Sequence, residues 1–208
     1  MRKLFFLLIM PILWSCSSNY TDWDLEGLKG KVKQYEERSS KAIEKFGEWA
    51  LNENDMSIKI VRFNENGRTK EWVMYDKNGG ELDKEILIYE GDKLIGSEYF
   101  AKKLKVGTLE IEQDGNKIVY RSRRTIPIYE ERIIKDKRIT RVITDDYGDG
   151  TFDTLNNEYS EKGLLRTSSI SSYENLEFDS KGNWTKRMIT SKERPEDRYV
   201  EQRVYEYF

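Results

Sequence analysis

The stretch SIKIVRFNENGRTKEWVMYDKNGGELDKEILIYEGDK, residues 57–93, decides the fold of this 208-residue chain. Within it an alternating apolar run reaches an aromatic residue, breaks at a polar turn, and starts again. The motif reads FNENG at 63–67, YDKNG at 75–79 and YEGDK at 89–93. Asn-Gly pairs supply the positive φ angles of tight hairpin turns. The stretch therefore predicts consecutive β-hairpins.

The same pattern continues as YSEKG at 159–163 and FDSKG at 178–182. Short connections favour antiparallel neighbours, because a parallel crossover needs about a dozen residues or more. We predict an all-β protein, an antiparallel β-meander of repeated hairpins forming one long twisted sheet; a rolled or barrel-like closure is the alternative. A first strand is expected near 28–35, and the others at 57–63, 69–75, 82–89, 94–100, 105–112, 117–124, 127–135, 138–144, 151–159, 164–170, 174–178, 183–190 and 198–207.

One short helix is predicted at 41–51, KAIEKFGEWAL, because Ala42, Phe46 and Trp49 share a face with a period of 3.6 residues. Gly47 weakens the helix by about 1 kcal/mol relative to alanine. A strand over 41–46 is the alternative.

The N-terminus has the features of an export signal: Arg2 and Lys3, then an apolar run over 4–13 that is too short to remain as a membrane span. Cys16, the single cysteine of the chain, follows this run and resembles the acylated first residue of a bacterial lipoprotein. An ordinary secretory signal with an incidental cysteine is the alternative. We predict a signal peptide at 1–15, a lipidated tether at 16–27 and a single β-meander domain at 28–208.

Lipidation at Cys16 predicts a membrane-anchored protein of the cell envelope, at the outer membrane, on either its surface or its periplasmic face. Charged residues make up 36% of the chain and aromatic residues 12%. Disordered chains share such charge but lack the aromatic residues, so we expect a folded protein with a thin core. The charges are mixed in sign and form no basic stripe, which argues against a nucleic-acid partner.

Catalytic chemistry is restricted by the absence of histidine and by the commitment of Cys16 to lipid. These two facts exclude Ser-His-Asp and Cys-His arrangements and histidine or cysteine metal sites. We therefore predict a protein that is not an enzyme. A carboxylate-dependent polysaccharide hydrolase needs only Asp or Glu and is the alternative.

An acidic loop at 145–153 is the candidate metal site. Measured against an EF-hand-like calcium loop, Asp145, Asp149 and Asp153 occupy positions 1, 5 and 9. Tyr147 and Asn156 stand where the pattern requires ligands. The alternative is a polar turn whose aspartates cap backbone amides.

Aromatic residues along the strands suggest a ligand surface, with Trp184 and Trp72 as the candidate contacts. Rings exposed on a flat sheet would form a platform for a glycan or a peptide. Aromatic residues that stack across strands as core are the alternative.

The motifs YDKNG at 75–79 and FDSKGNWTKR at 178–187 resemble the YD repeats of the RHS family, and YEGDKLIGSEY at 89–99 is similar to a MORN-type repeat. The resemblance implies β-hairpins that join side by side, as in small bacterial lipoproteins with such repeats. We predict a non-enzymatic envelope protein acting as a scaffold or as a binding surface for a protein or glycan. An immunity or antitoxin-like role, by analogy with MORN-type proteins, is a further alternative.

Overall fold

The computed structural model describes residues 20–122, 129–145 and 150–208. These residues form one antiparallel sheet, a short α-helix and a 3-10 turn. The elements are α1 (Asp22–Glu26), β1 (Val32–Lys45), β2 (Glu48–Leu51), η1 (Glu53–Asp55), β3 (Ser57–Phe63), β4 (Thr69–Tyr75), β5 (Glu81–Glu90), β6 (Lys93–Ala101), β7 (Leu104–Asp114), β8 (Lys117–Ser122), β9 (Tyr129–Lys135), β10 (Arg138–Asp145), β11 (Asp153–Tyr159), β12 (Leu165–Ser168), β13 (Ser171–Phe178), β14 (Trp184–Ser191) and β15 (Arg198–Tyr207).

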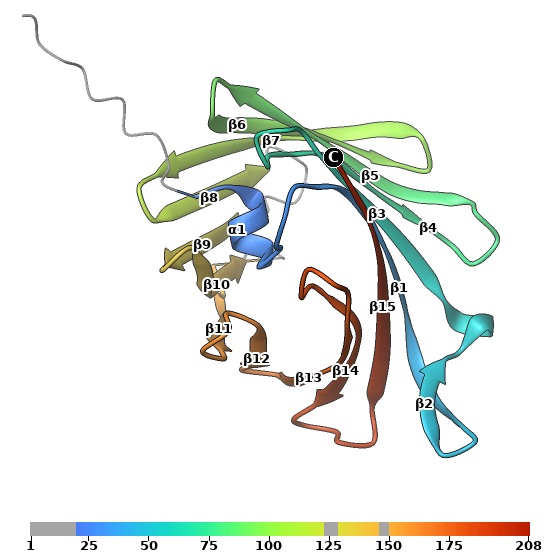
Figure 1. Cartoon of the computed structure of the whole chain (residues 1–208). Coiled ribbons are helices and arrows are strands. Elements are labelled where there is room, and N and C mark those ends of the chain that lie inside the picture. Colours follow the sequence, from blue (N-terminus) through green and yellow to red (C-terminus); the bar gives the residue numbers. More distant parts are fainter. Residues whose placement is uncertain (1–19, 123–128, 146–149) are drawn as a thin grey trace, which may run out of the picture.

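The sheet closes on itself. From β3 to β15 each strand pairs with the next, and β15 pairs in turn with β1, which pairs with β3. The closing register places Glu36 opposite Val204. Figure 1 shows the strands as a ring around α1, with β2 outside the ring. The predicted antiparallel meander is confirmed, and it forms a closed barrel rather than an open twisted sheet.

The turns explain why the strands end where they do. In the β3–β4 turn the side chain of Asn64 accepts hydrogen bonds from the backbone N–H groups of Asn66 and Arg68, and Gly67 has φ +78°. In the β13–β14 turn Asp179 accepts in the same way from Lys181 and Asn183. Such side-chain caps fix tight turns locally, so the bounds of β3 and β4 match the predicted strands.

The predicted helix at 41–51 is wrong. Residues 41–45 are the end of β1, which forms a hairpin with β2. Phe46 and Gly47 have φ angles of +56° and +84°, the left-handed conformation of a two-residue hairpin turn. Ala42, Trp49 and Leu51 pack against Met188 and Val200 on the outside of the barrel, so their apolar spacing reflects cross-strand contact.

The only α-helix among the described residues lies in the segment predicted as a tether. Thr21 and Asp24 form a capping box at its N-terminus, and Gly27, with φ +71°, ends it. A helix of one to two turns is unstable alone, so its packing in the barrel holds it. We call residues 20–31 the N-terminal plug.

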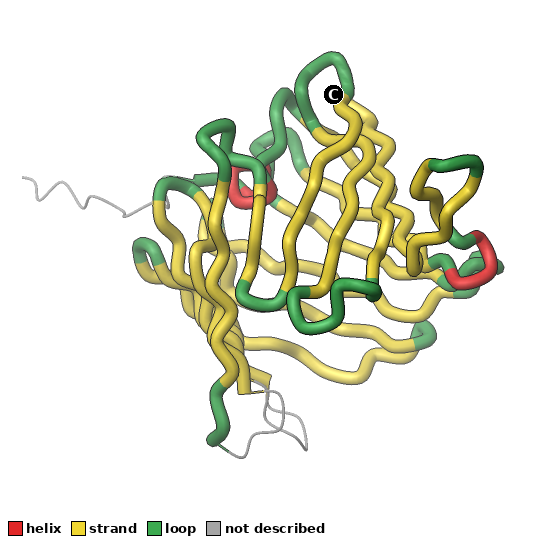
Figure 2. The backbone as a smooth tube through the Cα atoms, turned by 90° about the horizontal axis from the view of Figure 1, so that it is seen from below, coloured by secondary structure: helices red, strands yellow, loops and turns green. Residues whose placement is uncertain are grey.

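The N-terminal plug contacts the hairpin turns at one end of the barrel. The backbone N–H of Asp22 donates to the carbonyl of Gly67 at 3.0 Å, and the hydroxyl of Tyr20 donates to Gly115 at 3.4 Å. The N–H of Lys29 donates to Asn183 at 2.7 Å. Figure 2 shows the strands as a continuous wall, with α1 beside the loops at one end. The plug therefore closes this end.

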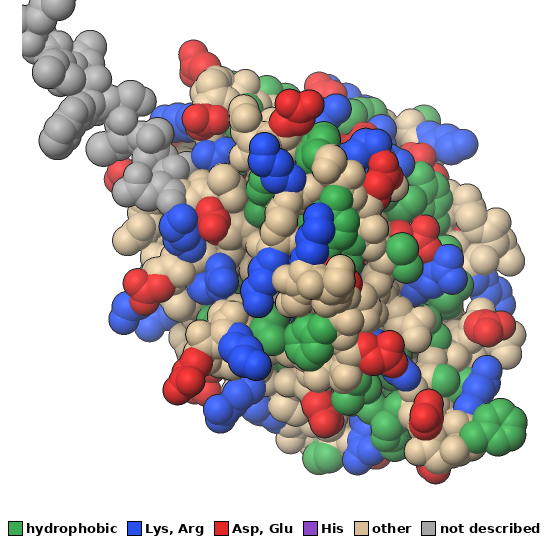
Figure 3. All heavy atoms as spheres, viewed as in Figure 1, with side chains coloured by type: hydrophobic (Ala, Val, Ile, Leu, Met, Phe, Trp, Pro, Cys, Tyr) green, Lys and Arg blue, Asp and Glu red, His purple; other side chains and the backbone are tan. Residues whose placement is uncertain are grey.

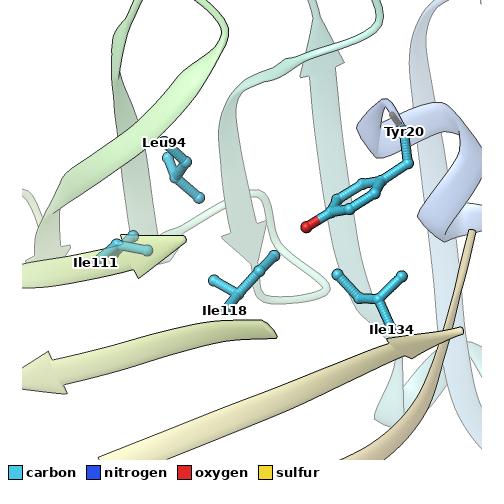
Figure 4. Close-up of a cluster of buried hydrophobic side chains, with 5 residues drawn as sticks. All are labelled: Tyr20, Leu94, Ile111, Ile118 and Ile134. Atoms are coloured by element: carbon cyan, nitrogen blue, oxygen red, sulfur yellow. The ribbon is translucent and has the colours of Figure 1, made fainter. Parts of the chain in front are cut away.

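Tyr20 also completes an apolar cluster inside the barrel (Figure 4). Its ring packs among side chains from four strands, Leu94, Ile111, Ile118 and Ile134, and all five residues are buried. Its hydroxyl accepts a hydrogen bond from Gln113 at 2.9 Å. The start of the described chain is thus part of the core.

The outer face of the wall carries ion pairs between neighbouring strands. Lys105 pairs with Glu98, and Arg121 with Glu112, at 2.5 and 2.7 Å. The carboxylate of Glu71 forms ion pairs with both Arg62 and Lys84. Figure 3 shows charges of both signs distributed over one side of the molecule. These pairs connect neighbouring strands across the surface, in keeping with the mixed charge of the sequence.

Candidate ligand site inside the barrel

The interior is lined by alternate residues of each strand, because successive side chains on a strand point to opposite faces. Cross-strand partners share a face. The register places Lys59 opposite Glu37, Val61 opposite Trp72, and Trp72 opposite Glu85. The interior of this part of the wall is therefore both aromatic and charged.

Residues of α1 line two cavities of the described structure, and the larger of these two has a volume of about 220 Å³. It lies between α1 and the strands β3, β4, β5, β6, β8, β9 and β10. Carboxylates, cations and rings alternate with aliphatic side chains around it, and its polar and aromatic members include Asp22, Glu26, Lys59, Trp72, Glu85, Tyr120 and Arg132. We call this the larger cavity.

Trp72 is fixed in the wall of the larger cavity by its neighbours. Its indole N–H donates to Glu85 at 2.6 Å, and the hydroxyl of Ser97 donates to the other oxygen of Glu85 at 2.5 Å. The ammonium of Lys59 lies 5.3 Å from the centroid of the Trp72 ring, within cation–π range. Ring, cation and carboxylate thus form one contiguous surface.

Arg132 faces this surface from the other side of the cavity. Its Nε donates to Glu130 at 2.5 Å, and its guanidinium carbon lies 4.6 Å from the centroid of the Tyr120 ring. Burial raises the pKa of Tyr120 to about 12. The Tyr120 hydroxyl consequently remains protonated at neutral pH and can donate a hydrogen bond.

A smaller cavity of about 180 Å³ lies on the other side of α1. Leu25 and Glu26 line both cavities, so the plug separates them. Trp184, which is 6% exposed, lines the smaller cavity. The guanidinium carbons of Arg187 and Arg203 lie 4.1 and 4.3 Å from the centroid of its ring.

These two arginines belong to a buried ionic network. Arg203 donates to Glu37 at 2.7 Å, and Arg187 donates to Glu201 at 2.5 Å. Burial alone would raise the pKa of Glu37, but the guanidinium of Arg203, with Arg187 and Lys59, holds it below its usual value. Burial, and then repulsion by Glu37, raise the pKa of Glu201 above its usual value.

Both predicted ligand contacts, Trp72 and Trp184, line interior cavities. The structure does not bring them together, since the plug lies between the two cavities. The expectation of an exposed flat platform is not met at these two residues, because the sheet closes with their rings inside. Trp184 instead stacks with arginines, much as the core alternative describes.

Sequence reasoning missed the charged interior residues, above all Lys59, Glu85 and Arg132. In the sequence they stand among many similar charges, which were expected on outward faces. A usable signal existed, because each lies an even number of residues from an inward apolar or aromatic neighbour: Lys59 from Val61, Glu85 from Leu87, and Arg132 from Ile134.

Of the predicted calcium ligands, Asp149 lies outside the described residues. Asp145 is buried and accepts a hydrogen bond from the backbone N–H of Gly150 at 3.1 Å, as the alternative of a polar turn describes. Asp153 is an exposed residue at the start of β11. Within 20–122, 129–145 and 150–208, no group of three or more acidic side chains is placed to hold a metal ion.

The predicted lipidation site, Cys16, also lies outside the described residues. Across the described part of the chain, no helix has the length and apolar character needed to cross a membrane.

No protein-family model matches the sequence, and no curated protein sequence is significantly similar to it. Among solved structures, the barrel is similar to a porin-like protein from Bacteroides uniformis. The two chains are 8% identical, and the match covers 86% of this chain and 99% of that chain with a TM-score of 0.35.

Proposed function

We propose that this protein is a non-enzymatic, lipid-anchored binding protein of the cell envelope that holds a small polar ligand inside its barrel. The observation that carries the proposal is the larger cavity, where Trp72 is combined with the charged groups of Lys59, Glu85 and Arg132. Ligand sites typically combine an enclosed, aromatic surface with a few fixed polar groups. A scaffold would require neither the cavity nor its charged wall.

The outer face supports a barrel that stands in water beside the membrane. Closed antiparallel barrels include both outer-membrane proteins and water-exposed ligand binders. A lysine or arginine on a lipid-facing wall costs about 2–4 kcal/mol at the bilayer midplane. Arg62, Lys84, Lys105 and Arg121 are all paired on the outer face, which favours water as their surroundings.

Anchoring at Cys16 would orient the barrel. Four Cα steps connect Cys16 to Tyr20, and an extended chain spans at most about 3.3–3.6 Å per residue. The lipid would therefore hold the plugged end close to the membrane surface. In that orientation the opposite end of the barrel faces away from the membrane and admits the ligand.

The binding proposal is tested with the low-molecular-weight fraction of a digested bacterial envelope. We expect saturable quenching of tryptophan fluorescence that is lost in Trp72→Ala. Trp49→Ala is the matched control, because Trp49 packs on the outside of the barrel beneath Arg198 and should retain the quenching. Equal loss in both variants, or no quenching by any fraction, would overturn the proposal.

The anchor is tested separately with Cys16→Ser. We expect this variant to lose incorporation of labelled palmitate and to leave the membrane fraction, with its circular dichroism spectrum unchanged. Continued membrane association without palmitate labelling would show that the lipid is not the anchor.

A carboxylate-dependent hydrolase is the second candidate, and one observation favours it. Glu37 and Glu201 are interior neighbours whose pKa values are shifted in opposite directions, as in many acid–base pairs. Each, however, is held by an arginine at 2.7 Å or less, which favours a structural role. Turnover of envelope polysaccharide that disappears in Glu201→Gln but persists in Glu112→Gln would establish the hydrolase instead.

A further inference from the structure

We propose that the larger cavity binds a single neutral sugar ring. This inference rests on the proposed function and narrows its ligand from a small polar molecule to an uncharged, hydroxyl-rich one. Four observations lead to it. The carboxylates of the cavity already accept hydrogen bonds, its cations have N–H groups without hydrogen-bond partners among the described residues, its charges are nearly balanced, and Trp72 lies in its wall.

The carboxylates of the larger cavity are already held by neutral donors. Glu85 accepts from Trp72 and Ser97, one at each oxygen. Asp22 accepts from the backbone N–H of Thr69 at 2.7 Å and from the hydroxyl of Tyr89 at 2.8 Å. A carboxylate has about four lone-pair positions, so each keeps capacity for a further hydroxyl donor in a fixed orientation.

The cations of the cavity have donors to spare. Lys59 makes no hydrogen bond or ion pair with any described residue. Its ammonium lies beside the ring of Trp72, and its charge helps to lower the pKa of Glu37 on the neighbouring strand. Arg132 bonds Glu130 only through Nε, and its terminal nitrogens have no hydrogen-bond partner among the described residues. Both side chains line the larger cavity. They come from β3 and β9, on opposite parts of the wall, and can donate to acceptor oxygens of one ligand.

The balance of charge selects a neutral ligand. Asp22, Glu26 and Glu85 face Lys59 and Arg132 around the cavity. Glu26 is also paired with Arg203 at 3.5 Å, so acidic and basic groups are nearly balanced. An acidic ligand would upset this balance and would meet the carboxylates of Asp22 and Glu85. An ammonium-bearing ligand would meet Lys59 and Arg132, the two groups whose donors are unused. A ligand of hydroxyl groups can accept from these cations and donate to the carboxylates without bringing a charge of its own.

Trp72 and the size of the cavity complete the match. A sugar ring has C–H groups on its faces and hydroxyl groups around its edge, and aromatic side chains supply a flat apolar surface beside polar groups. The cavity volume of about 220 Å³ is below the roughly 300–1,000 Å³ of typical ligand pockets. It therefore suits one ring rather than an oligosaccharide.

The test is fluorine NMR on the chain from Ser17 onward, which contains every described residue, with fluorinated tryptophan at Trp23, Trp49, Trp72 and Trp184. The probes are glucose, galactose, mannose and N-acetylglucosamine, with galacturonate and glucosamine as charged analogues. We expect at least one neutral sugar to shift the Trp72 resonance saturably and to bind more tightly than either charged analogue. The resonance of Trp49, on the outside, should not move.

Variants assign the site. Lys59→Met should weaken binding of that sugar about tenfold or more, which corresponds to about 1.4 kcal/mol. Lys84→Met is the matched control, since Lys84 pairs with Glu71 on the outer face, and it should bind like the unmodified chain. The proposal is overturned if a charged analogue binds more tightly than every neutral sugar, if no sugar shifts Trp72, or if both variants bind equally. Should the envelope digest still perturb Trp72 in that case, the binding function stands and only the neutral sugar is rejected.

Discussion

The interior and the outer face of the barrel wall are both rich in charge, but their ion pairs differ in surroundings. Inside, Arg203 and Glu37 are 7% and 14% exposed, and their pair belongs to a network with stacked aromatic rings. Outside, Arg121 and Glu112 are 47% and 69% exposed. Exposed pairs contribute little to stability, whereas breaking a buried pair leaves a charge without compensation. Location, rather than the number of charges, therefore decides which pairs matter.

The largest expected effect is the removal of an interior cation. Arg203→Met leaves Glu37 buried without its closest cation and should lower the free energy of unfolding by about 3–5 kcal/mol. Arg121→Met, the matched change on the outer face, should leave it almost unchanged. Urea denaturation followed by circular dichroism measures both. Similar losses for the two variants would remove the distinction between the faces.

A second comparison contrasts a turn that contacts the plug with a turn that faces solvent. A Cβ atom on Gly67 would lie 2.6 Å from the ring of Trp23, whereas one on Gly79 has nothing within 4 Å. Both glycines have φ near +80°. Gly67→Ala should cost roughly 2–4 kcal/mol through strain and overpacking, and Gly79→Ala about 1–2 kcal/mol through strain alone. Equal costs in thermal or urea unfolding would show that the plug does not pack against this turn.

The third test uses pH. Because the folded pKa of Glu37 is lowered, its contribution is present above its unfolded pKa and is lost as pH falls through the folded value. Because the folded pKa of Glu201 is raised, its contribution is present below its unfolded pKa and is lost as pH rises through the folded value. Glu201→Gln should remove the loss of stability that Glu201 causes as pH rises. The free energy of unfolding of this variant should therefore rise more steeply with pH than that of the unmodified chain. If the free energies of unfolding of the two chains changed in parallel from acid to neutral pH, the raised pKa of Glu201 would be contradicted.

The smallest expected effect is that of salt. A double-mutant cycle on Arg62 and Glu71, on the outer face, should give a coupling energy of about 0.2–1 kcal/mol that nearly vanishes in ~1 M NaCl. A cycle on Arg203 and Glu37 should keep most of its coupling, since buried pairs are screened much less. If salt reduced the two coupling energies equally, the exposed pair and the buried pair would not differ in their surroundings as described.

The strands could be predicted from the sequence because their ends are encoded locally. Asn64 with Gly67, and Asp179 with Gly182, fix turns through contacts within a few residues. Closure could not be predicted, because the pairing of β1 with β15 joins distant residues that have no local signature. The prediction of a helix at 41–51 was wrong for a similar reason, because the apolar residues of that segment pack against Met188 and Val200, which are distant in the sequence.

The candidate site was only partly accessible to sequence reasoning. Trp72 and Trp184 stood out as large aromatic residues, and both line cavities. The role of Lys59 depends on which face of β3 is enclosed. The helix α1, which forms part of the wall of each cavity, lay in the segment predicted as a tether. Without closure, an inward charge and an outward charge have the same appearance in the sequence.

Closure of the barrel is the central claim, and a disulfide across its seam tests it most directly. Glu36 and Val204 are opposite each other on β1 and β15, and directly opposed strand residues have Cα atoms about 4.5–5.5 Å apart, within disulfide range. In the chain from Ser17 onward, which lacks cysteine, Glu36→Cys with Val204→Cys should cross-link almost completely under mild oxidation. Glu36→Cys with Arg121→Cys should not. A seam pair that stays reduced while the protein is folded would contradict the closed barrel, and with it the enclosed site.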